Sequence, residues 1–464
     1  MKDTYIEDFR RAGREVIDWI ARYLENPRTY PVVPRMRPGE LVDSLPASGP
    51  EFGETYEAIL RDFEDKVMPA VTHWNHPRFF AYFGSSSAAP AVLAEAIAAA
   101  LNTNGIHWLT SPAVSELEQV ALSWYRQWLG LPDDFTGFIY DTASVSTLHG
   151  IAGAREMAQP EAREEGYVAN MTLYCSEQAH SSVEKGAIAL GIGRRNVRKI
   201  ATDAEFRMIP DALEAAIRDD IARGLRPFCI VATIGTTSTT SIDPVPEIAA
   251  IARRYGAWLH VDAAYAGSAA IVPEHRYILA GCEHADSFVV NAHKWLLTPL
   301  DCSVFFTRRP DIFRRAFSLV PEYLRTAEDP RAVNLMEYGI PLGRRFRALK
   351  LWFVMRYFGR QRIAEVIREH IELAREFAAM VDSDSRFERL APVPFSVVCF
   401  RYRGTDEENA ALLARVNASG QSFLSHTELN DRYVLRMAVG NLGTTREDVA
   451  ATWDMVRAAV PVNA

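Results

Sequence analysis

The chain has 464 residues, of which 48% are hydrophobic and 24% charged, and this composition excludes a fibrous or disordered protein. A formal net charge of −8, without any lysine- or arginine-rich block, argues against a nucleic-acid-binding protein and favours small-molecule partners. Five scattered cysteines without a C-x-x-C pair, and no apolar signal-peptide core in the first residues, predict a soluble cytoplasmic protein with reduced thiols.

The first 85 residues predict helices without a core of their own. Apolar residues at helical spacing predict a helix over 4–24, proline and glycine predict an extended segment over 27–50, and a second helix is expected over 54–68. Because so few residues cannot enclose a core, we expect 1–85 to lie over another surface, such as that of a second subunit.

Residues 75–132 contain an aromatic segment, an apolar helical stretch and the start and end of a further helix. Segment 75–84 places aromatic residues beside turn residues, which on its own favours hydrophobic core beneath a turn over the wall of a pocket for a flat ligand. The stretch Ser115-Glu-Leu-Glu118 has the form of a capping box and predicts a helix start, and Leu129-Gly-Leu-Pro132 predicts the end of that helix. Between them, the most apolar helical stretch, 90–101, is interrupted by Glu95, so no membrane-spanning helix is predicted.

From residue 138 to about 310, short apolar strands alternate with helical segments, which predicts an α/β domain over 86–350 with a mainly parallel sheet. The expected strands are 138–140, 171–175, 228–232, 258–261, 288–290 and 303–306. A long amphipathic helix near 360–382, followed by strands over 395–402 and 432–439, predicts a small α+β domain over 351–464.

Polar residues follow the first five of these strands. In parallel sheets ligands collect just beyond the carboxyl ends of the strands, so these residues are candidates for one site. They are Thr142 and Ser144, His180, Thr236 and Thr237, Asp262, and the group Asn291, His293 and Lys294.

Together these residues have the chemistry that pyridoxal phosphate (PLP) needs. Lys294 offers the amine for a Schiff base, and the carboxylate of Asp262 would keep the pyridine nitrogen protonated. The helix start at Thr142–Ser144 offers amide donors for a phosphate, and His180 offers an imidazole plane for stacking. Taken singly, each has a commoner structural interpretation, such as a helix cap for Asp262 or a structural loop histidine for His180.

Several long motifs resemble the group II PLP-dependent amino-acid decarboxylases, and within them the aromatic-amino-acid decarboxylases. The resemblance covers essentially the whole chain. Its motifs include Leu259-His-Val-Asp-Ala-Ala-Tyr-Ala-Gly-Ser268, Asn291-Ala-His-Lys-Trp295, Ser176-Glu-Gln-Ala-His-Ser-Ser-Val-Glu184, Thr72-His-Trp-Asn-His-Pro77, Ser111-Pro-Ala-Val-Ser-Glu-Leu-Glu118 and Ile340-Pro-Leu-Gly-Arg-Arg-Phe-Arg347.

The resemblance implies roles for individual residues. Lys294 would be the Schiff-base lysine, Asp262 the partner of the pyridine nitrogen and His180 the stacking residue, and Tyr323, in the segment 319–330, would take part in returning a proton to Cα. The phosphate cup would include Ala143, Ser144, Asn291 and His293, with Thr237 near the cofactor. No metal-binding residue is predicted.

The same resemblance implies a fold and an assembly. The expected fold is the aspartate-aminotransferase type (fold type I), with a seven-stranded sheet. The expected assembly is a homodimer with the active site at the interface and residues 1–85 wrapped over the partner. The substrate pocket would contain Trp74, Tyr82, Phe83, Gly84, Ile106 and Gly343.

The chain departs from the family at several positions. Asp141 and Thr142 replace a small Gly-Ser before the cup, and we expect Asp141 to turn away from the phosphate because a carboxylate there would weaken binding. Val145 replaces an acidic residue, and Ala292 replaces a proline, which should be tolerated. Gly84 and Ile106 stand where proline and phenylalanine are usual, which predicts a roomier pocket and broad aromatic specificity.

Two other functions compete with amine-forming decarboxylation. In aromatic aldehyde synthases of this family a phenylalanine replaces the loop tyrosine or an asparagine replaces the stacking histidine, whereas this chain retains Tyr323 and His180. A non-catalytic PLP-binding protein would be indicated by loss of Lys294, Asp262 or Tyr323, and all three are present. Release of CO₂ and amine, or of aldehyde, ammonia and peroxide, distinguishes the first two activities.

Overall fold

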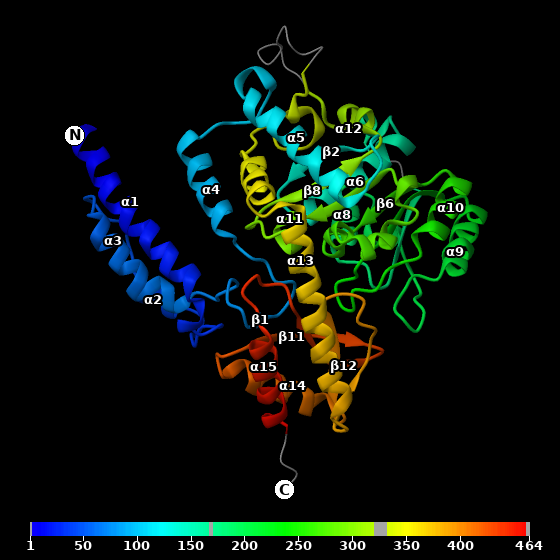
Figure 1. The fold of residues 1–464 in the computed structure, drawn as a ribbon. Coiled ribbons are helices and arrows are strands. Elements are labelled where there is room, and N and C mark those ends of the chain that lie inside the picture. The colour runs from blue at the N-terminus through cyan, green and yellow to red at the C-terminus, as the bar shows by residue number, and fades with distance from the viewer. Residues whose placement is uncertain (1, 167–169, 320–331, 461–464) are drawn as a thin grey trace. The chain divides into compact units, whose positions relative to one another are not determined.

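The computed structural model describes residues 2–166, 170–319 and 332–460 and divides into two compact units (Figure 1). Unit 1 comprises Met1–Gly84, Ala379–Arg389 and Phe400–Ala464, and unit 2 comprises Ser85–Ala378 and Leu390–Cys399. This division differs from the domains expected from the sequence. The N-terminal segment belongs to the same unit as the C-terminal region, and residues 351–378 belong to the large unit because the long helix α13 (Arg347–Ser383) begins there.

Unit 2 is built on a seven-stranded sheet in the order β2-β8-β7-β6-β5-β3-β4. Strand β8 is antiparallel to β2 and β7, and the other neighbours are parallel, so β2 points the same way as β3 to β7. This confirms the predicted α/β fold with a seven-stranded, mainly parallel sheet. The strands are β2 (Thr136–Tyr140), β3 (Met171–Ser176), β4 (Val197–Ile200), β5 (Arg226–Thr233), β6 (Trp258–Asp262), β7 (Ser287–Asn291) and β8 (Ser303–Thr307).

The central strands form because they are continuous apolar runs that can be buried on both faces. Every residue of β6, β7 and β8 is buried, and Phe288 and Phe306 are among the largest fully buried side chains. Helix α6 packs against β5 to β8 and contacts α8 and α12. The helices of unit 2 are α4 (Ala89–Leu101), α5 (Pro112–Leu129), α6 (Ala143–Ala158), α7 (Ala162–Glu165), α8 (Ser182–Ala189), α9 (Pro210–Ala222), α10 (Val245–Tyr255), α11 (Ala292–Trp295), α12 (Pro310–Phe317) and most of α13.

The capping box expected at 115–118 is wrong. Helix α5 begins four residues earlier, with Ser111 instead of Ser115 at the N-cap and Pro112 in the first turn, a position where proline's missing N–H costs nothing. Glu118 is buried inside the helix and accepts a hydrogen bond of 2.9 Å from the backbone N–H of Ile139. The predicted end of the helix is confirmed, because Gly130 adopts the left-handed conformation that caps it (φ 88°).

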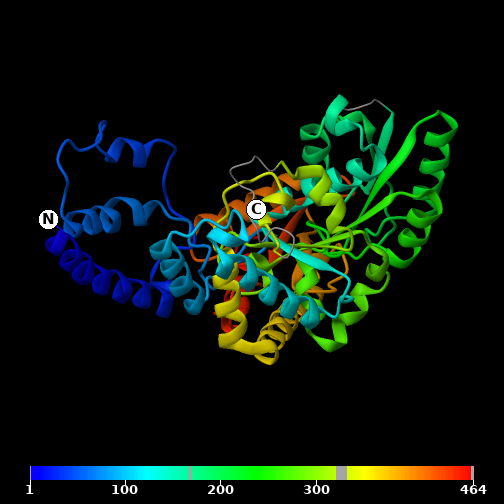
Figure 2. The same ribbon diagram turned by 90° about the horizontal axis from the view of Figure 1, so that it is seen from above.

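In unit 1 the first helix is found where it was expected, as α1 (Lys2–Glu25). The second is shorter than expected: α3 (Tyr56–Asp62) passes into a π-helical turn (Phe63–Val67) and a 3₁₀ turn (Met68–Ala70). Figure 2 shows α1 and α3 side by side, and the rings of Trp19 and Phe63 meet edge to face at 5.3 Å. Helix α2 (Glu40–Ser44) lies in the segment expected to be extended. Among the described helices, none is long and apolar enough to cross a bilayer.

The rest of unit 1 surrounds a five-stranded sheet in the order β1-β11-β12-β10-β9. The two-residue strand β1 joins the N-terminal segment to this sheet by parallel pairing with β11. The elements are β1 (Phe79–Phe80), β9 (Phe387–Arg389), β10 (Val397–Tyr402, with its residues from Phe400 on in unit 1), β11 (Phe423–Leu429), β12 (Arg432–Ala438), α14 (Asp406–Ala418) and α15 (Arg446–Ala458).

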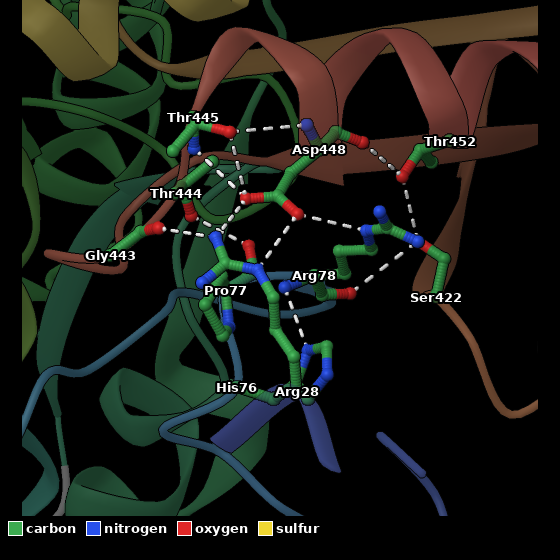
Figure 3. A network of polar contacts seen from close by, with 10 residues as sticks. All are labelled: Arg28, His76, Pro77, Arg78, Ser422, Gly443, Thr444, Thr445, Asp448 and Thr452. Carbon is green, nitrogen blue, oxygen red and sulfur yellow. Dashed lines mark hydrogen bonds and ion pairs between the residues drawn. The ribbon is translucent and has the colours of Figure 1, made fainter. Parts of the chain in front are cut away.

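A buried carboxylate fixes this connection (Figure 3). Asp448, in the first turn of α15, accepts hydrogen bonds from Arg28 at 2.6 Å and from Arg78 at 2.9 Å. The two guanidinium groups hold the pKa of Asp448 below its ordinary value against the opposing effect of burial. The N-terminal segment is therefore attached to α15 immediately before β1.

Candidate active site

The predicted cofactor residues lie at one edge of the sheet of unit 2. Because β2, β3, β5, β6 and β7 point the same way, their carboxyl ends share this edge. Asp262 is the last residue of β6 and Asn291 the last residue of β7. Helix α6 begins just after β2, and His180 lies between β3 and α8.

Lys294 is placed by a rigid neighbour. It lies on the four-residue helix α11, and the next residue, Trp295, is 1% exposed. The ring of Trp295 stacks on Tyr265 at 4.7 Å, and its Nε1 donates a hydrogen bond of 2.9 Å to Nδ1 of His370. So short a helix has little stability of its own, so this anchoring determines where the lysine begins.

His293 is a neutral hydrogen-bond donor at the same edge. Its Nδ1 accepts the backbone N–H of Cys302 at 2.9 Å, so the ring proton is on Nε2. Burial, reinforced by the ammonium group of Lys294, lowers the pKa of His293 to about 4. The ring is therefore uncharged near neutral pH and presents an N–H group, which suits a phosphate oxygen.

Asp262 and Lys294 both act electrostatically on His180. His180 is exposed in the single chain, yet desolvation by the surrounding protein lowers its pKa. The carboxylate of Asp262 opposes this lowering of the pKa, and the ammonium group of Lys294 reinforces it. Nδ1 of His180 accepts the backbone N–H of Ser182 at 3.1 Å, which fixes the ring through the start of α8. The result is a neutral imidazole plane beside a carboxylate and an amine.

Just before the expected phosphate cup is Thr142, the N-cap of α6, whose side chain makes no capping hydrogen bond. Ala143 and Ser144 follow in the first turn, where amide groups and the helix dipole favour an anion. The carboxylate of Asp141 accepts a hydrogen bond of 2.6 Å from the N–H of Thr142. Burial would lower the pKa of the Arg347 guanidinium, but Asp301 raises it above its ordinary value and Asp141 adds to this effect, so the carboxylate of Asp141 also interacts with a positive charge within unit 2.

In the loop after β5 the two threonines have different positions. Thr236 is fully buried, and its hydroxyl accepts the N–H of Ser241 at 3.0 Å. Thr237 is exposed. Thr237 is therefore the accessible member of the pair, and its place near the cofactor stays a prediction.

The residues at this edge fit PLP. Oδ1 of Asn291 is buried without a hydrogen-bond partner among the described residues, and such an atom is costly unless a ligand satisfies it. Together with the Nε2–H of His293 and the start of α6, it provides polar groups for a phosphate. The carboxylate of Asp262, 5% exposed, suits a cationic ring nitrogen.

Four of the predicted pocket residues lie together in unit 1. The exposed rings of Trp74 and Tyr82 stack at 5.6 Å with an interplanar angle of 14°, and Phe83 is buried. Gly84 does not add the room that was expected from its size. A Cβ atom on Gly84 would lie 3.3 Å from the backbone of Gly440, so that space is already filled.

The remaining pocket residues that the structure describes, Ile106 and Gly343, lie close together in unit 2. Gly105 donates a backbone hydrogen bond of 2.9 Å to Arg344, and a Cβ on Gly343 would lie 3.5 Å from Asn104. That distance is ordinary contact, so the structure does not require glycine at 343. Tyr323 lies outside the described residues, and its role stays a prediction.

The chain is similar to one family model and to several known proteins. The model of the "pyridoxal-dependent decarboxylase conserved domain" matches residues 38–403. The chain is 41% identical to tyrosine decarboxylase 3 of Petroselinum crispum (97% of this chain, 91% of the relative) and 41% identical to aromatic-L-amino-acid decarboxylase of Mus musculus (97% and 96%).

The chain belongs to the pyridoxal-dependent decarboxylase family. Among solved structures, this decarboxylase is similar to Oryza sativa TDC with PLP and tryptamine (TM-score 0.94, 36% identity, 98% of this chain and 97% of that one). It is also similar to 4-hydroxyphenylacetaldehyde synthase of Rhodiola rosea (TM-score 0.92, 35% identity, 98% of each chain). Its cofactor is pyridoxal phosphate.

Sequence reasoning missed the residues that support this decarboxylase's site from behind. Arg344 is buried, pairs with Glu118 at 2.8 Å and donates to the carbonyl group of Ile139 at 2.6 Å, so it joins α5 and β2 to the segment that carries Gly343. Reading Glu118 as a surface capping residue hid this pair. The sequence did contain a signal for this pair. Glu118 is a single glutamate in an apolar helix face, and Arg344, in the motif over 340–347, has the complementary charge.

Proposed function

We propose that this decarboxylase converts aromatic L-amino acids, of the tryptophan, 5-hydroxytryptophan, tyrosine, DOPA and phenylalanine class, to the corresponding arylalkylamines and CO₂. The observation that carries the proposal is the position of Lys294 at the same sheet edge as Asp262 and His180, where Asp262 and Lys294 both act electrostatically on His180. The substrate class is supported by the relatives, which are named for tyrosine and for aromatic L-amino acids.

The chain's own residues have separate tasks in this reaction. When bound, the cofactor supplies an electron sink for breaking the bond between Cα and the carboxylate. Lys294 would hold the cofactor covalently until the substrate amine replaces it. Asp262 would hold a proton on the ring nitrogen, and neutral His180 would provide a flat, uncharged surface that does not repel a cationic ring.

The return of a proton to Cα is assigned to Tyr323 by resemblance. A phenol hydroxyl can donate a proton as a general acid, and a loop can exclude water while it does so. Retention of Tyr323 and His180 supports amine as the product rather than aldehyde. The similarity to an aldehyde synthase keeps that activity as the second candidate.

The substrate class is tested by competition. Tryptophan, 5-hydroxytryptophan, tyrosine, DOPA and phenylalanine are mixed at equal concentration with glutamate as an acidic control, and the amines are quantified. We expect amines from several aromatic substrates, because a roomy apolar pocket discriminates among rings by only about 1–3 kcal/mol per methylene-sized difference. We expect no amine from glutamate. Preference for glutamate would contradict the proposal.

We also propose that the enzyme is a homodimer. Apolar side chains are exposed on helix α4 at four-residue spacing, with Leu93, Ile97 and Leu101 44–58% exposed, and Leu300 and Ile340 are 65–69% exposed. Within unit 1, α1 exposes further large apolar side chains, including Phe9 at 58%. Exposed apolar surface of this extent is typical of a subunit interface.

Sedimentation equilibrium tests the assembly. The expected mass is twice that of one chain, and Leu93→Glu/Ile97→Glu should shift it toward the monomer, whereas Ile221→Glu, at an exposed apolar residue of α9 outside the N-terminal segment, is the control. A monomeric wild type would contradict the proposal.

A cytoplasmic location remains a prediction, supported by five buried cysteines that form no disulfide.

A further inference from the structure

The turn that carries Tyr82 is held in an unusual backbone conformation. Tyr82 has φ of 53°, in the left-handed region that bulky side chains rarely adopt. A residue stays there only when its surroundings impose it. The surroundings of this turn therefore determine where the exposed ring of Tyr82, stacked on Trp74, is presented.

Two residues of one cross-strand pair hold the backbone of Tyr82. Ser425 of β11 and Arg436 of β12 are direct register partners. Oγ of Ser425 accepts the N–H of Tyr82 at 3.2 Å, and Nη1 of Arg436 donates to the carbonyl oxygen of Tyr82. The backbone N–H and carbonyl groups of Tyr82 are thus both bound by one cross-strand residue pair of the sheet.

Arg436 also positions the next ring. Its guanidinium carbon lies 4.6 Å from the ring centroid of Phe83, a distance typical of a cation–π contact. Arg436 is 3% exposed and Phe83 9% exposed, so the contact is shielded from water. Beyond it, the close backbone packing of Gly84 and Gly440 ends the turn against the residues after β12.

The base of the same segment is fixed separately (Figure 3). Thr444 donates a hydrogen bond of 2.6 Å to the carbonyl oxygen of Pro77, and Arg78 is paired with Asp448. These contacts attach the segment to unit 1 whatever the turn does. Arg436 contacts the turn itself, at Tyr82 and Phe83, whereas Thr444 and Asp448 hold the base of the segment.

We propose that Arg436 is a positioning residue that sets the aromatic wall formed by Tyr82 and Phe83 and thereby the enzyme's preference among aromatic substrates. This inference rests on the proposed function, in which that turn belongs to the substrate pocket. Arg436 does not touch the reacting atoms; it acts through the backbone of Tyr82 and the ring of Phe83. Its loss should alter substrate binding more than the chemical step.

The test compares variants of the purified holoenzyme. Arg436→Met should raise KM for tryptophan and tyrosine by about tenfold or more, with a smaller change in kcat, because a displaced wall misplaces the substrate. It should also change the ratio of kcat/KM for the two substrates. Arg436→Lys should recover part of the loss, since lysine can donate to the carbonyl oxygen but has no planar group to lie over Phe83.

Arg432→Met is the matched control. Arg432 lies on the same strand and is paired with Glu388 rather than with the turn. The control should keep wild-type KM values and the wild-type substrate ratio. An unchanged ratio in Arg436→Met, with both KM values equal to those of the control, would overturn the inference.

Two further measurements keep the test decisive. If Arg436→Met does not fold, Ser425→Ala and Arg436→Lys replace it, and both should change the tryptophan-to-tyrosine ratio in the same direction; no change in either contradicts the proposal. Cofactor content, read from visible absorbance, should stay at the wild-type level in all variants. A wild type that turns over no aromatic amino acid refutes the proposed function, whereas an active wild type with inert variants refutes only the role of Arg436.

Discussion

The backbone N–H of Ile340 donates a hydrogen bond of 3.2 Å to Nε2 of His149. Because Nε2 accepts, the ring proton is on Nδ1, which donates to the carbonyl oxygen of Val145 at 2.7 Å. His149 is fully buried, and burial lowers its pKa to about 4. The helix that opens with the phosphate cup is thereby joined to the segment that leads to Gly343 by a histidine that must stay neutral.

This neutral histidine predicts a loss of stability in acid. The folded pKa is about 4 and the ordinary value is 6.5, so between these values the unfolded chain binds a proton that the folded chain does not. The contribution is therefore fully present above pH 6.5 and is lost as the pH falls, at up to about 1.4 kcal/mol per pH unit. Burial raises the pKa of Asp243 to about 6, which acts in the opposite direction below that pH.

His149→Gln isolates the histidine's part. The variant lacks the titrating group, so its unfolding free energy in urea should fall less steeply than that of the wild type between pH 6.5 and 5. His426→Gln, at an exposed position on β11, is the control and should run parallel to the wild type. Parallel curves for wild type and His149→Gln would show that His149 takes up its proton in the folded state.

Asp262→Asn should fold normally and bind cofactor but lose activity. An amide is isosteric with the carboxylate and can still accept the N–H of Ala264, yet it cannot hold a proton on the ring nitrogen by charge. We expect kcat to fall by about 100-fold or more. The control is Asp286→Asn, which lies before β7 at the other end of the strands and should change stability rather than kcat. Activity of Asp262→Asn within a few-fold of wild type would assign the role to another residue.

Ile106→Phe tests the space in the pocket. Ile106 is half-buried, and a phenylalanine there would take up room that an indole ring needs more than a phenol ring does. The variant should lose more kcat/KM for tryptophan than for tyrosine. Equal losses, or no turnover of tryptophan by the wild type, would refute the prediction of a roomy pocket.

Tyr323→Phe tests the assigned proton donor. Removing the hydroxyl leaves carbon–carbon bond cleavage possible but takes away the acid that completes the amine. In air, with dissolved O₂ as the oxidant, the products should shift from amine toward aldehyde, ammonia and peroxide, and amine and aldehyde are measured by chromatography from the same reaction. Amine alone at the wild-type rate would mean that the proton comes from elsewhere.

Much of unit 2 could be predicted from the sequence because its strands are short apolar runs bounded by turns. All six expected strands are present, from β2 to β8. Strand β4 was missed because its sequence, Val-Arg-Lys-Ile, is polar, and only Ile200 is buried at this edge of the sheet. The two residues of β1 give too short a pattern to detect, and they form a strand only because β11 pairs with them.

Some residues of the candidate site could be predicted from the sequence, and others could not. Motifs with several fixed residues located Lys294, Asp262 and His180, and the structure places all three at one sheet edge. Local sequence could not show that Gly440 fills the space beside Gly84, because the contact joins residues far apart in the chain. The same limitation hid Arg436, whose importance depends on cross-strand register and not on its neighbours in sequence.

The central claim is that Lys294 enables this chain to release CO₂ and amine from aromatic L-amino acids. The most direct measurement is the product balance of wild type and Lys294→Ala on tryptophan and tyrosine, followed together with the visible absorbance of the bound cofactor. The wild type should give CO₂ and amine in equal amounts without ammonia or peroxide, and Lys294→Ala should give neither product and lose the visible band. Aldehyde with ammonia and peroxide from the wild type, or amine formation that survives in Lys294→Ala, would contradict the claim.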